Sequence, residues 1–212
     1  MSRVQISRRR LIATACLAPL ADCSLLPDSP APQMYRLSPA DLDPADAPLR
    51  RGSLAIGMPT APENLDSDRI ALTRGTTRFD YFADSTWTDR VPVLLQTSLV
   101  DAFETDGRIA DVWTDPNPMA ANYLLETVVR AFAARYDNAA TAPPVVEVSL
   151  DLRLVRLSKH ETVGRTLIAE HDAATRNELR SIVAAFDVAA GKVLNRCVAW
   201  TLSAIQEGPH HA

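Results

Sequence analysis

The stretch that decides the fold is VVEVSLDLRLVRLSK, residues 145–159. Aliphatic side chains occupy every second position from Val146 to Leu154, with charged or polar side chains between them. Because successive side chains of a strand point to opposite faces, this alternation predicts a strand with one buried face. After Leu154 the apolar phase moves to Val155 and Leu157, which is the one-residue shift that a β-bulge produces.

The chain after this stretch predicts a partner strand and a long helix. TVGRTLIAE, residues 162–170, follows the turn SKHE and is expected to return as an antiparallel partner. From 175 to 206, apolar residues recur at spacings of three and four, which is typical of one face of an amphipathic helix. This stripe consists of Ile182, Phe186, Ala189, Ala190, Val193, Cys197, Trp200 and Ile205.

The chain before it predicts short strands and a first helix. The strands are expected at 53–59, 69–75, 77–83 and 108–114. The first helix is expected to be capped by Ser85 or Thr86, with Asp89 completing a Thr-x-x-Asp start, and to stop at Gly107. Trp87 begins the apolar stripe of this helix.

Residues 121–136 fit two kinds of element. The spacing of Leu124 and Val128 suits a helix, whereas the alternation of Tyr123 and Leu125 suits a strand, and the pattern leaves both open. Strands, a helix, more strands and a closing helix together predict an α+β fold. We expect an antiparallel-rich sheet with two main helices packed on one face.

The composition favours a single domain and does not predict a cationic surface that would bind polyanions. At 212 residues and 47% hydrophobic content, the chain can close one core. Residues 1–22 hold four of the 22 basic and one of the 26 acidic residues, so the remainder has a net charge of about −7. Neither a P-loop nor a G-x-G-x-x-G pattern occurs in the sequence. We therefore expect no nucleic-acid partner and no cofactor.

Residues 1–22 have the architecture of a secretory signal peptide. Four arginines precede eleven mostly apolar residues, Leu11 to Ala21. A membrane-spanning helix needs about 20 apolar residues, so a cleaved signal fits better than a permanent anchor helix. SRRRLI, residues 7–12, also resembles the twin-arginine export signal, and both export routes stay open.

LADCSLLP, residues 20–27, resembles the lipobox of a bacterial lipoprotein. Leu20 and Ala21 fit the pattern before Cys23, whereas Asp22 stands where the lipobox has a small, uncharged residue. Cys16 is the competing site, because a small residue precedes it, but it leaves a hydrophobic segment of only five residues before it. We expect Cys23 to carry the lipid, and the efficiency of processing past Asp22 stays open.

The residues after Cys23 indicate where the anchored chain resides. An aspartate after the acylated cysteine retains Gram-negative lipoproteins at the inner membrane, so Ser24 resembles the outer-membrane class. Several acyl chains anchor stably, since each buried methylene contributes about 0.8 kcal/mol. Fully extended, a tether of about 25 residues could span roughly 80 Å. We expect a signal peptide over 1–22, a lipidated tether over 23–51 with a short strand at 34–37, a folded domain over 52–207 and a disordered tail over 208–212.

The residues offer no persuasive catalytic or metal-binding set. His160, Glu161, His171 and Asp172 form two His-acid pairs, but a strand between them would separate the two histidines by roughly 35 Å. Zinc ligands must all lie about 2 Å from one ion, so these residues are expected in solvated turns. Cys197 lies on an apolar stripe and is expected to be a buried, unreactive thiol. We expect neither a metal site nor an enzyme.

Several segments resemble the ABC-type transport auxiliary lipoprotein family, which includes the paraquat-inducible lipoprotein. They are CSLLP, YRLSP, LAIGMPTAPENLDSDRIAL, FDYFADSTWTDRVPVLLQTSLVDAFETDG and VSLDLRLVRL. The resemblance covers about residues 20–206, and its most specific piece runs from Trp87 to Gln96. Asp22 and the alanine-rich segment 121–140 depart from the family pattern.

The resemblance implies a strand at 121–136 and a role in lipid transport. Members accompany an ABC permease, an ATPase and a membrane-anchored substrate-binding protein of the mammalian-cell-entry type, which move lipids between the two membranes. Trp87 and Asp89 correspond to structural family positions, with the Asp89 carboxylate favoured by the helix dipole. Partner-binding residues are not identified by any motif.

Three hypotheses for the function follow. The first is a non-enzymatic outer-membrane lipoprotein on the periplasmic side, docked onto a lipid-conducting partner of the mammalian-cell-entry type, with a homo-oligomeric ring as one arrangement. The second is a periplasmic lipid-binding shuttle that holds an acyl chain between its sheet and helices, which requires an apolar cavity. The third is a periplasmic hydrolase of an unrecognised type.

Overall fold

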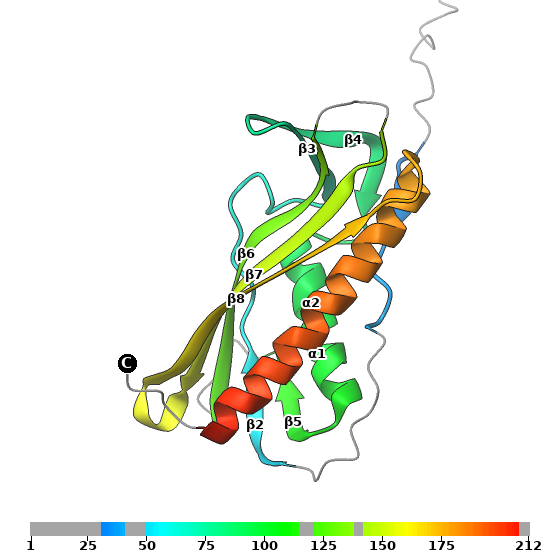
Figure 1. The fold of residues 1–212 in the computed structure, drawn as a ribbon. Coiled ribbons are helices and arrows are strands. Elements are labelled where there is room, and N and C mark those ends of the chain that lie inside the picture. The colour runs from blue at the N-terminus through cyan, green and yellow to red at the C-terminus, as the bar shows by residue number, and fades with distance from the viewer. Residues whose placement is uncertain (1–30, 41–49, 115–120, 138–141, 208–212) are drawn as a thin grey trace, which may run out of the picture. The chain divides into compact units, whose positions relative to one another are not determined.

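The computed structural model describes residues 31–40, 50–114, 121–137 and 142–207 (Figure 1). All of them belong to one unit, Ala31–Ala212. The predicted signal peptide, lipobox and C-terminal tail lie outside the described residues. Neither α-helix in the described part combines the length and the apolar character that crossing a membrane requires.

The described residues form a mixed sheet of eight strands and two α-helices (Figure 1). The strands are β1 (Gln33–Tyr35), β2 (Arg50–Ile56), β3 (Arg69–Arg74), β4 (Arg78–Trp87), β5 (Ile109–Trp113), β6 (Tyr123–Tyr136), β7 (Val145–Arg156) and β8 (Glu161–Ala173). The helices are α1 (Val91–Asp106), α2 (Leu179–Glu207) and a short 3-10 helix before β8 (Leu157–Lys159). This arrangement confirms the predicted α+β fold.

The long strand β6 connects the two halves of the sheet. Along one edge it pairs with β7, which pairs in turn with β8, and both pairings are antiparallel. Along its other edge β6 pairs in parallel with β2 near its beginning and with β3 near its end. The sheet continues from β2 to β5, and from β3 through β4 to β1. Leu125 and Ala134 mark these two ends of β6, which a rise of about 3.3 Å per residue places about 30 Å apart.

The deciding stretch forms β7 as its alternation predicts. The aliphatic side chains at alternate positions from Val146 to Leu154 are all 0% exposed. The predicted bulge occurs between Leu154 and Val155, but the extra residue, Val163, belongs to the neighbouring strand β8. The sequence of β7 therefore locates the irregularity correctly and assigns it to the wrong strand.

Residues 123–136 form a strand, as the family resemblance implied. Its pairing with β7 shifts by one residue between Val129 and Ala131. The buried side chains consequently alternate up to Val129 and resume three residues later at Phe132. This single spacing of three residues between buried side chains explains why the segment also fits a helical pattern.

The predicted start of the first helix is wrong, and its predicted end is confirmed. β4 extends to Trp87, and α1 begins only at Val91, with Arg90 as an N-cap that makes no side-chain bond. Thr86 pairs with residues of both β1 and β3, so its backbone is extended and cannot open a helix. Gly107 ends α1 in the left-handed conformation, with φ of 69°.

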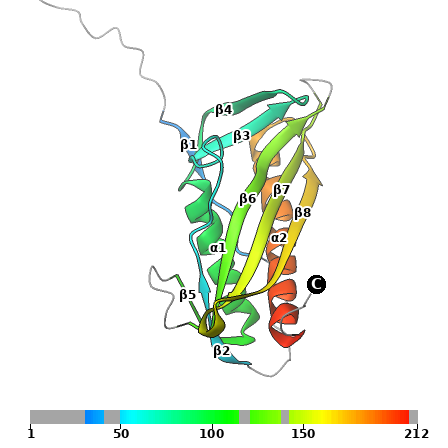
Figure 2. The ribbon, with the colours of Figure 1, turned by 90° about the vertical axis from the view of Figure 1, so that its left-hand side faces the viewer.

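Both helices cover one face of the sheet (Figure 2), and an aromatic cluster joins α2 to the sheet. α2 packs on β7 and β8, while α1 lies beside α2 and against β2 and β5. Trp87 of β4, Phe132 of β6 and Phe186 of α2 form the aromatic cluster, with ring centroids 4.9, 5.2 and 5.5 Å apart. These contacts join the sheet to α2 at the centre of the core.

Candidate functional site

The segment nearest the predicted lipid site is bound to the folded domain. β1 pairs in parallel with β4, and the N–H of Thr88 donates to the carbonyl of Tyr35 at 2.7 Å. Leu37 is 8% exposed and belongs to the core. The backbone N–H and the hydroxyl of Ser38 donate to the carboxylate of Asp187 on α2, at 2.9 and 3.1 Å. The domain therefore holds the chain from Gln33 to Ser38.

This attachment shortens the predicted tether. Cys23 itself lies outside the described residues. From Cys23 to Gln33 the chain has about ten residues, which span at most about 33 Å when fully extended. The short strand predicted at 34–37 is present at 33–35. The reach between a lipid on Cys23 and the domain is thus well below the roughly 80 Å expected for a free tether of about 25 residues.

Trp87 and Asp89, the two predicted family positions, have different surroundings. Trp87 is 1% exposed in the aromatic cluster, and its backbone N–H donates to the carbonyl of Asp68 at 2.6 Å. Asp89 is exposed and precedes Arg90, the N-cap of α1, so it does not make the predicted Thr-x-x-Asp start. The first turn of α1 contains no acidic residue. Trp87 is thus a core residue, whereas Asp89 lies on the surface before the helix.

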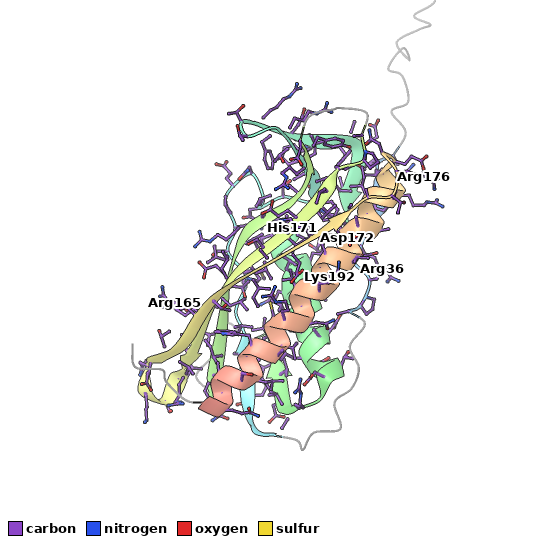
Figure 3. All side chains as sticks on the ribbon, viewed as in Figure 1. Arg36, Arg165, His171, Asp172, Arg176 and Lys192 are labelled. Carbon is purple, nitrogen blue, oxygen red and sulfur yellow. The ribbon has the colours of Figure 1, made fainter. Side chains whose placement is uncertain are left out.

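The predicted His-acid pairs do not come together. His160 lies in the turn before β8, and His171 lies near the far end of that strand. Asp172 forms an ion pair with Lys192 of α2 at 3.0 Å (Figure 3). Among the described residues, no group of three His, Cys, Asp or Glu side chains is placed to hold a metal ion.

Cys197 is enclosed by the core. Its side chain is 0% exposed on the face of α2 that packs against the sheet. Burial raises the pKa of the Cys197 thiol to about 12, and the nearby charge of Arg196 lowers it only in part. The group is therefore a protonated, inaccessible thiol at neutral pH.

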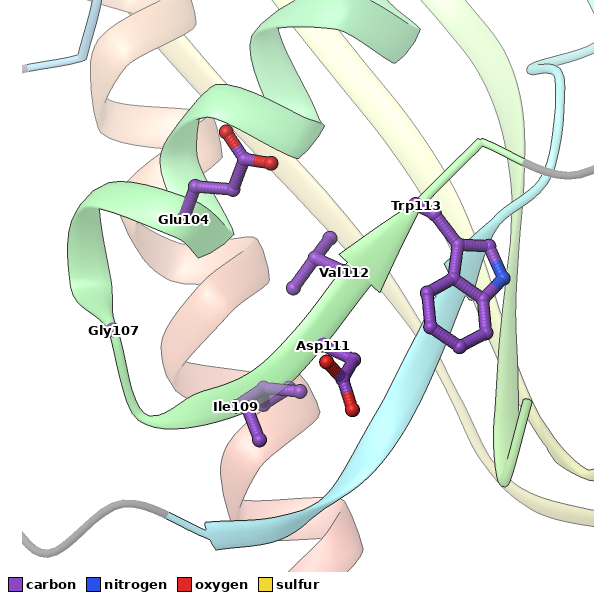
Figure 4. Close-up of a pocket in the computed structure, with 7 residues that line it drawn as sticks. Glu104, Gly107, Ile109, Asp111, Val112 and Trp113 are labelled. Carbon is purple, nitrogen blue, oxygen red and sulfur yellow. The ribbon is translucent and has the colours of Figure 1, made fainter. Parts of the chain in front are cut away.

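A cavity of about 340 Å³ lies between the end of α1 and β5 (Figure 4). Glu104, Gly107 and every residue of β5 line it. Because successive side chains of a strand point to opposite faces, a cavity that touches all five residues of β5 runs along the edge of that strand. β2 occupies one edge of β5, and no described strand pairs with the other. We call this feature the β5 groove.

Two carboxylates, those of Glu104 and Asp111, line the β5 groove. Glu104 and Asp111 are exposed, and neither forms an ion pair with another described residue. By contrast, the adjacent Asp106 is 6% exposed and accepts bonds of 2.6 and 2.7 Å from Arg108. The hydrogen bond to Asp106 raises the pKa of the Arg108 guanidinium, despite the opposing effect of burial. Among the described residues that line the groove, the charged ones are therefore both acidic.

Sequence reasoning did not find the β5 groove. It predicted a strand at 108–114 without indicating a groove beside it. The groove arises because β5 is the last strand of its half of the sheet, which depends on strand order. A short strand directly after a glycine-terminated helix was the available sequence signal, and it does not distinguish an edge strand from a central one.

The family model described as ABC-type transport auxiliary lipoprotein component matches residues 35–207. The match begins in β1 and extends to the end of α2, so it includes the N-terminal segment that the domain binds. An uncharacterised protein of Bradyrhizobium diazoefficiens is 30% identical over 168 residues, covering 79% of this chain and 44% of that protein. The chain thus spans less than half the length of this relative.

Two of the solved structures that share the fold are similar to this chain over most of its length. One is the crystal structure of a Xanthomonas campestris protein of the DUF330 family. Its TM-score is 0.75 and its sequence identity is 24%, and the match covers 82% of this chain and 97% of that chain. The other is a hypothetical protein of Chlamydia trachomatis, with a TM-score of 0.51 and 7% identity over 75% of this chain and all of that one (100%). At these identities the likeness shows a common fold.

Proposed function

The chain belongs to the ABC-type transport auxiliary lipoprotein family, and from this premise we propose a non-enzymatic lipoprotein anchored through Cys23 to the periplasmic face of the outer membrane. It serves as the auxiliary component of a lipid transport system of the mammalian-cell-entry type, which moves lipids between the two membranes. The folded domain docks onto the transport protein of that system, and copies of the chain assemble around it as a ring. Ser24, directly after the candidate lipid site, supports the outer membrane.

The observation that carries this proposal is the attachment of the N-terminal segment to the domain. β1 lies on β4, and Ser38 is bonded to Asp187 of α2. A lipid on Cys23 would therefore be joined through about ten residues to the rigid part of the domain. This arrangement suits a protein whose task is to present its domain at a limited distance from a membrane.

The chemistry of the described residues supports a binding role over catalysis. Cys197, with a pKa of about 12 and no exposure, is unsuited to nucleophilic attack. His160 and His171 lie at opposite ends of β8. Between the sheet and α2, where the shuttle hypothesis needs space for an acyl chain, the aromatic cluster occupies the core.

Intact mass of the membrane-extracted protein tests the anchor. We expect a chain truncated before Cys23 that carries acyl groups, and we expect Cys23→Ser to abolish both changes. Cys16→Ser is the matched control and should leave the product unchanged. A truncated chain without lipid, or a Cys23→Ser product identical to the wild type, would contradict the proposal.

Purification in mild detergent tests the role. The acylated protein, extracted from outer-membrane fractions, should bring with it the transport protein of the mammalian-cell-entry type. The Cys23→Ser variant should lose its membrane fraction while keeping its fold, as its circular dichroism would report. Extraction of the acylated protein without any transport component would count against the proposed role.

A further inference from the structure

Three strands lie at open edges of the described sheet: β1, β5 and β8. An exposed strand edge offers unpaired N–H and C=O groups to any extended chain, and proteins usually protect such edges with charge or cover. β8 has this protection. Glu170 and Asp172 of β8 form ion pairs with Arg196 and Lys192 of α2, at 2.5 and 3.0 Å, so charged side chains tie this strand to the helix.

β5 lacks that protection. Asp111 is its only charged residue, among Ile109, Ala110, Val112 and Trp113. No ion pair links β5 to another described element. Its open edge borders the β5 groove, whose opposite wall is the last turn of α1 with Glu104 and Gly107. The cavity of about 340 Å³ leaves space beside the strand where a covering side chain would otherwise lie.

An extended peptide fits this combination of an open edge and a groove. Five residues of β5 at about 3.3 Å each give an edge of about 17 Å, which a partner strand of similar length can pair with. In this mode of recognition main-chain hydrogen bonds supply affinity, and side-chain positions supply specificity. The strand edge can pair only with a segment in the extended conformation. The groove can accommodate the side chains at every second position of the added strand.

The charged residues that line the β5 groove indicate what kind of segment would bind there. Glu104 and Asp111 form no ion pair with a described side chain, so a basic residue of an added strand could pair with either carboxylate. Complementary charge gives specificity and a faster association more than it gives affinity. The occupant is therefore an extended segment with lysine or arginine at alternating positions.

The groove is also remote from the segment that leads to the predicted lipid. β5 adjoins the beginning of β6 through β2, whereas β1 adjoins the end of β6 through β4 and β3 (Figure 2). These ends of β6 are about 30 Å apart. A partner at the β5 groove would thus approach the end of the domain that lies away from the tether.

We propose that the β5 groove is a docking site for an extended basic segment of the transport partner, added as a strand to the open edge of β5. This inference rests on the proposed function for the identity of the partner, while the chemistry of the occupant rests on the groove alone. The two parts can be tested separately.

Synthetic peptides test the groove on the purified full chain. The probes are an extended peptide of alternating lysine and valine and its matched peptide of alternating glutamate and valine. We expect the lysine peptide to bind and to slow amide hydrogen exchange at residues 109–113. Glu104→Lys/Asp111→Lys should weaken this binding at least tenfold and should favour the glutamate peptide. Glu63→Lys/Asp89→Lys, which makes the same charge change at exposed residues elsewhere, should keep the affinity within twofold.

The possible results distinguish failure of the proposed docking site from failure of the proposed function. Absence of binding, protection at β8 in place of β5, or equal weakening in the two double variants would overturn the docking site. Co-purification of the transport component with Glu104→Lys/Asp111→Lys at wild-type yield would also overturn it, while the proposed function would stand. If the wild-type protein extracts no transport component, the proposed function fails, and the peptide measurements alone decide the groove.

Discussion

Replacing Phe186 by alanine should lower the free energy of unfolding by about 3–5 kcal/mol. Phe186 is 0% exposed, and its ring lies 5.2 Å from that of Trp87 and 4.9 Å from that of Phe132, measured between centroids. The loss includes the burial of the ring and the cavity left behind. The two ring contacts contribute about 0.5–1.5 kcal/mol each within that total. Because of these contacts, the contribution of Phe186 alone is a large fraction of the free energy of unfolding of a typical domain.

Urea unfolding followed by tryptophan fluorescence measures this loss. With a denaturant dependence of about 2 kcal/mol per molar urea, the midpoint should fall by about 2 M. Val188→Ala is the matched control: Val188 lies two residues further along α2, is 45% exposed, and should change stability by at most about 0.5 kcal/mol. A loss below about 1 kcal/mol for Phe186→Ala, or equal losses for both variants, would refute the packing described.

Three further predictions concern other parts of the domain. Gly164→Ala would bring a Cβ to 3.3 Å from Cζ2 of Trp200, so thermal unfolding should show a loss of about 1 kcal/mol; an unchanged Tm would contradict that contact. Because burial raises the pKa of Cys197 to about 12 whereas an unfolded thiol ionises near about 8.5, only the unfolded state loses this proton above pH about 9. Stability should therefore fall there by about 1.4 kcal/mol per pH unit more in the wild type than in Cys197→Ala, and equal slopes would exclude the buried thiol as the cause. Asp187→Ala removes the acceptor for both Ser38 donors and should speed amide exchange and proteolysis at residues 33–38, while Asp187→Asn keeps acceptor atoms and should change them less; unchanged exchange in Asp187→Ala would show that Ser38 does not secure the segment.

The elements that the sequence predicted well have patterns complete within one segment. Alternation from Val146 to Leu154 defines β7 because each of those side chains enters the same core. The β6 segment was ambiguous because the shift after Val129 puts a spacing of three into a strand. The start of α1 was misplaced because the Thr86-x-x-Asp89 pattern imitates a cap, while pairing with β1 and β3 keeps Thr86 extended.

The candidate site was beyond sequence reasoning for a different reason. The β5 groove exists because β5 follows β2 at an end of the sheet and α1 ends beside it. The attachment of the N-terminal segment joins Ser38 to Asp187, which are 149 residues apart in the chain. Neither feature leaves a local pattern, because both arise from strand order and long-range contacts.

The direction of β1 determines how the domain responds to tension. β1 runs parallel to β4, β4 antiparallel to β3, and β3 parallel to β6, so the N-terminal end of β1 points away from the β5 end of the domain. A pull applied between Gln33 and the β5 end therefore acts along the strands, across their hydrogen bonds. In such shear the bonds between β1 and β4 stretch together and must break together, whereas a sideways pull would open them one at a time. Because all the hydrogen bonds to β4 carry the load at once, the three-residue strand β1 resists the pull with their combined strength.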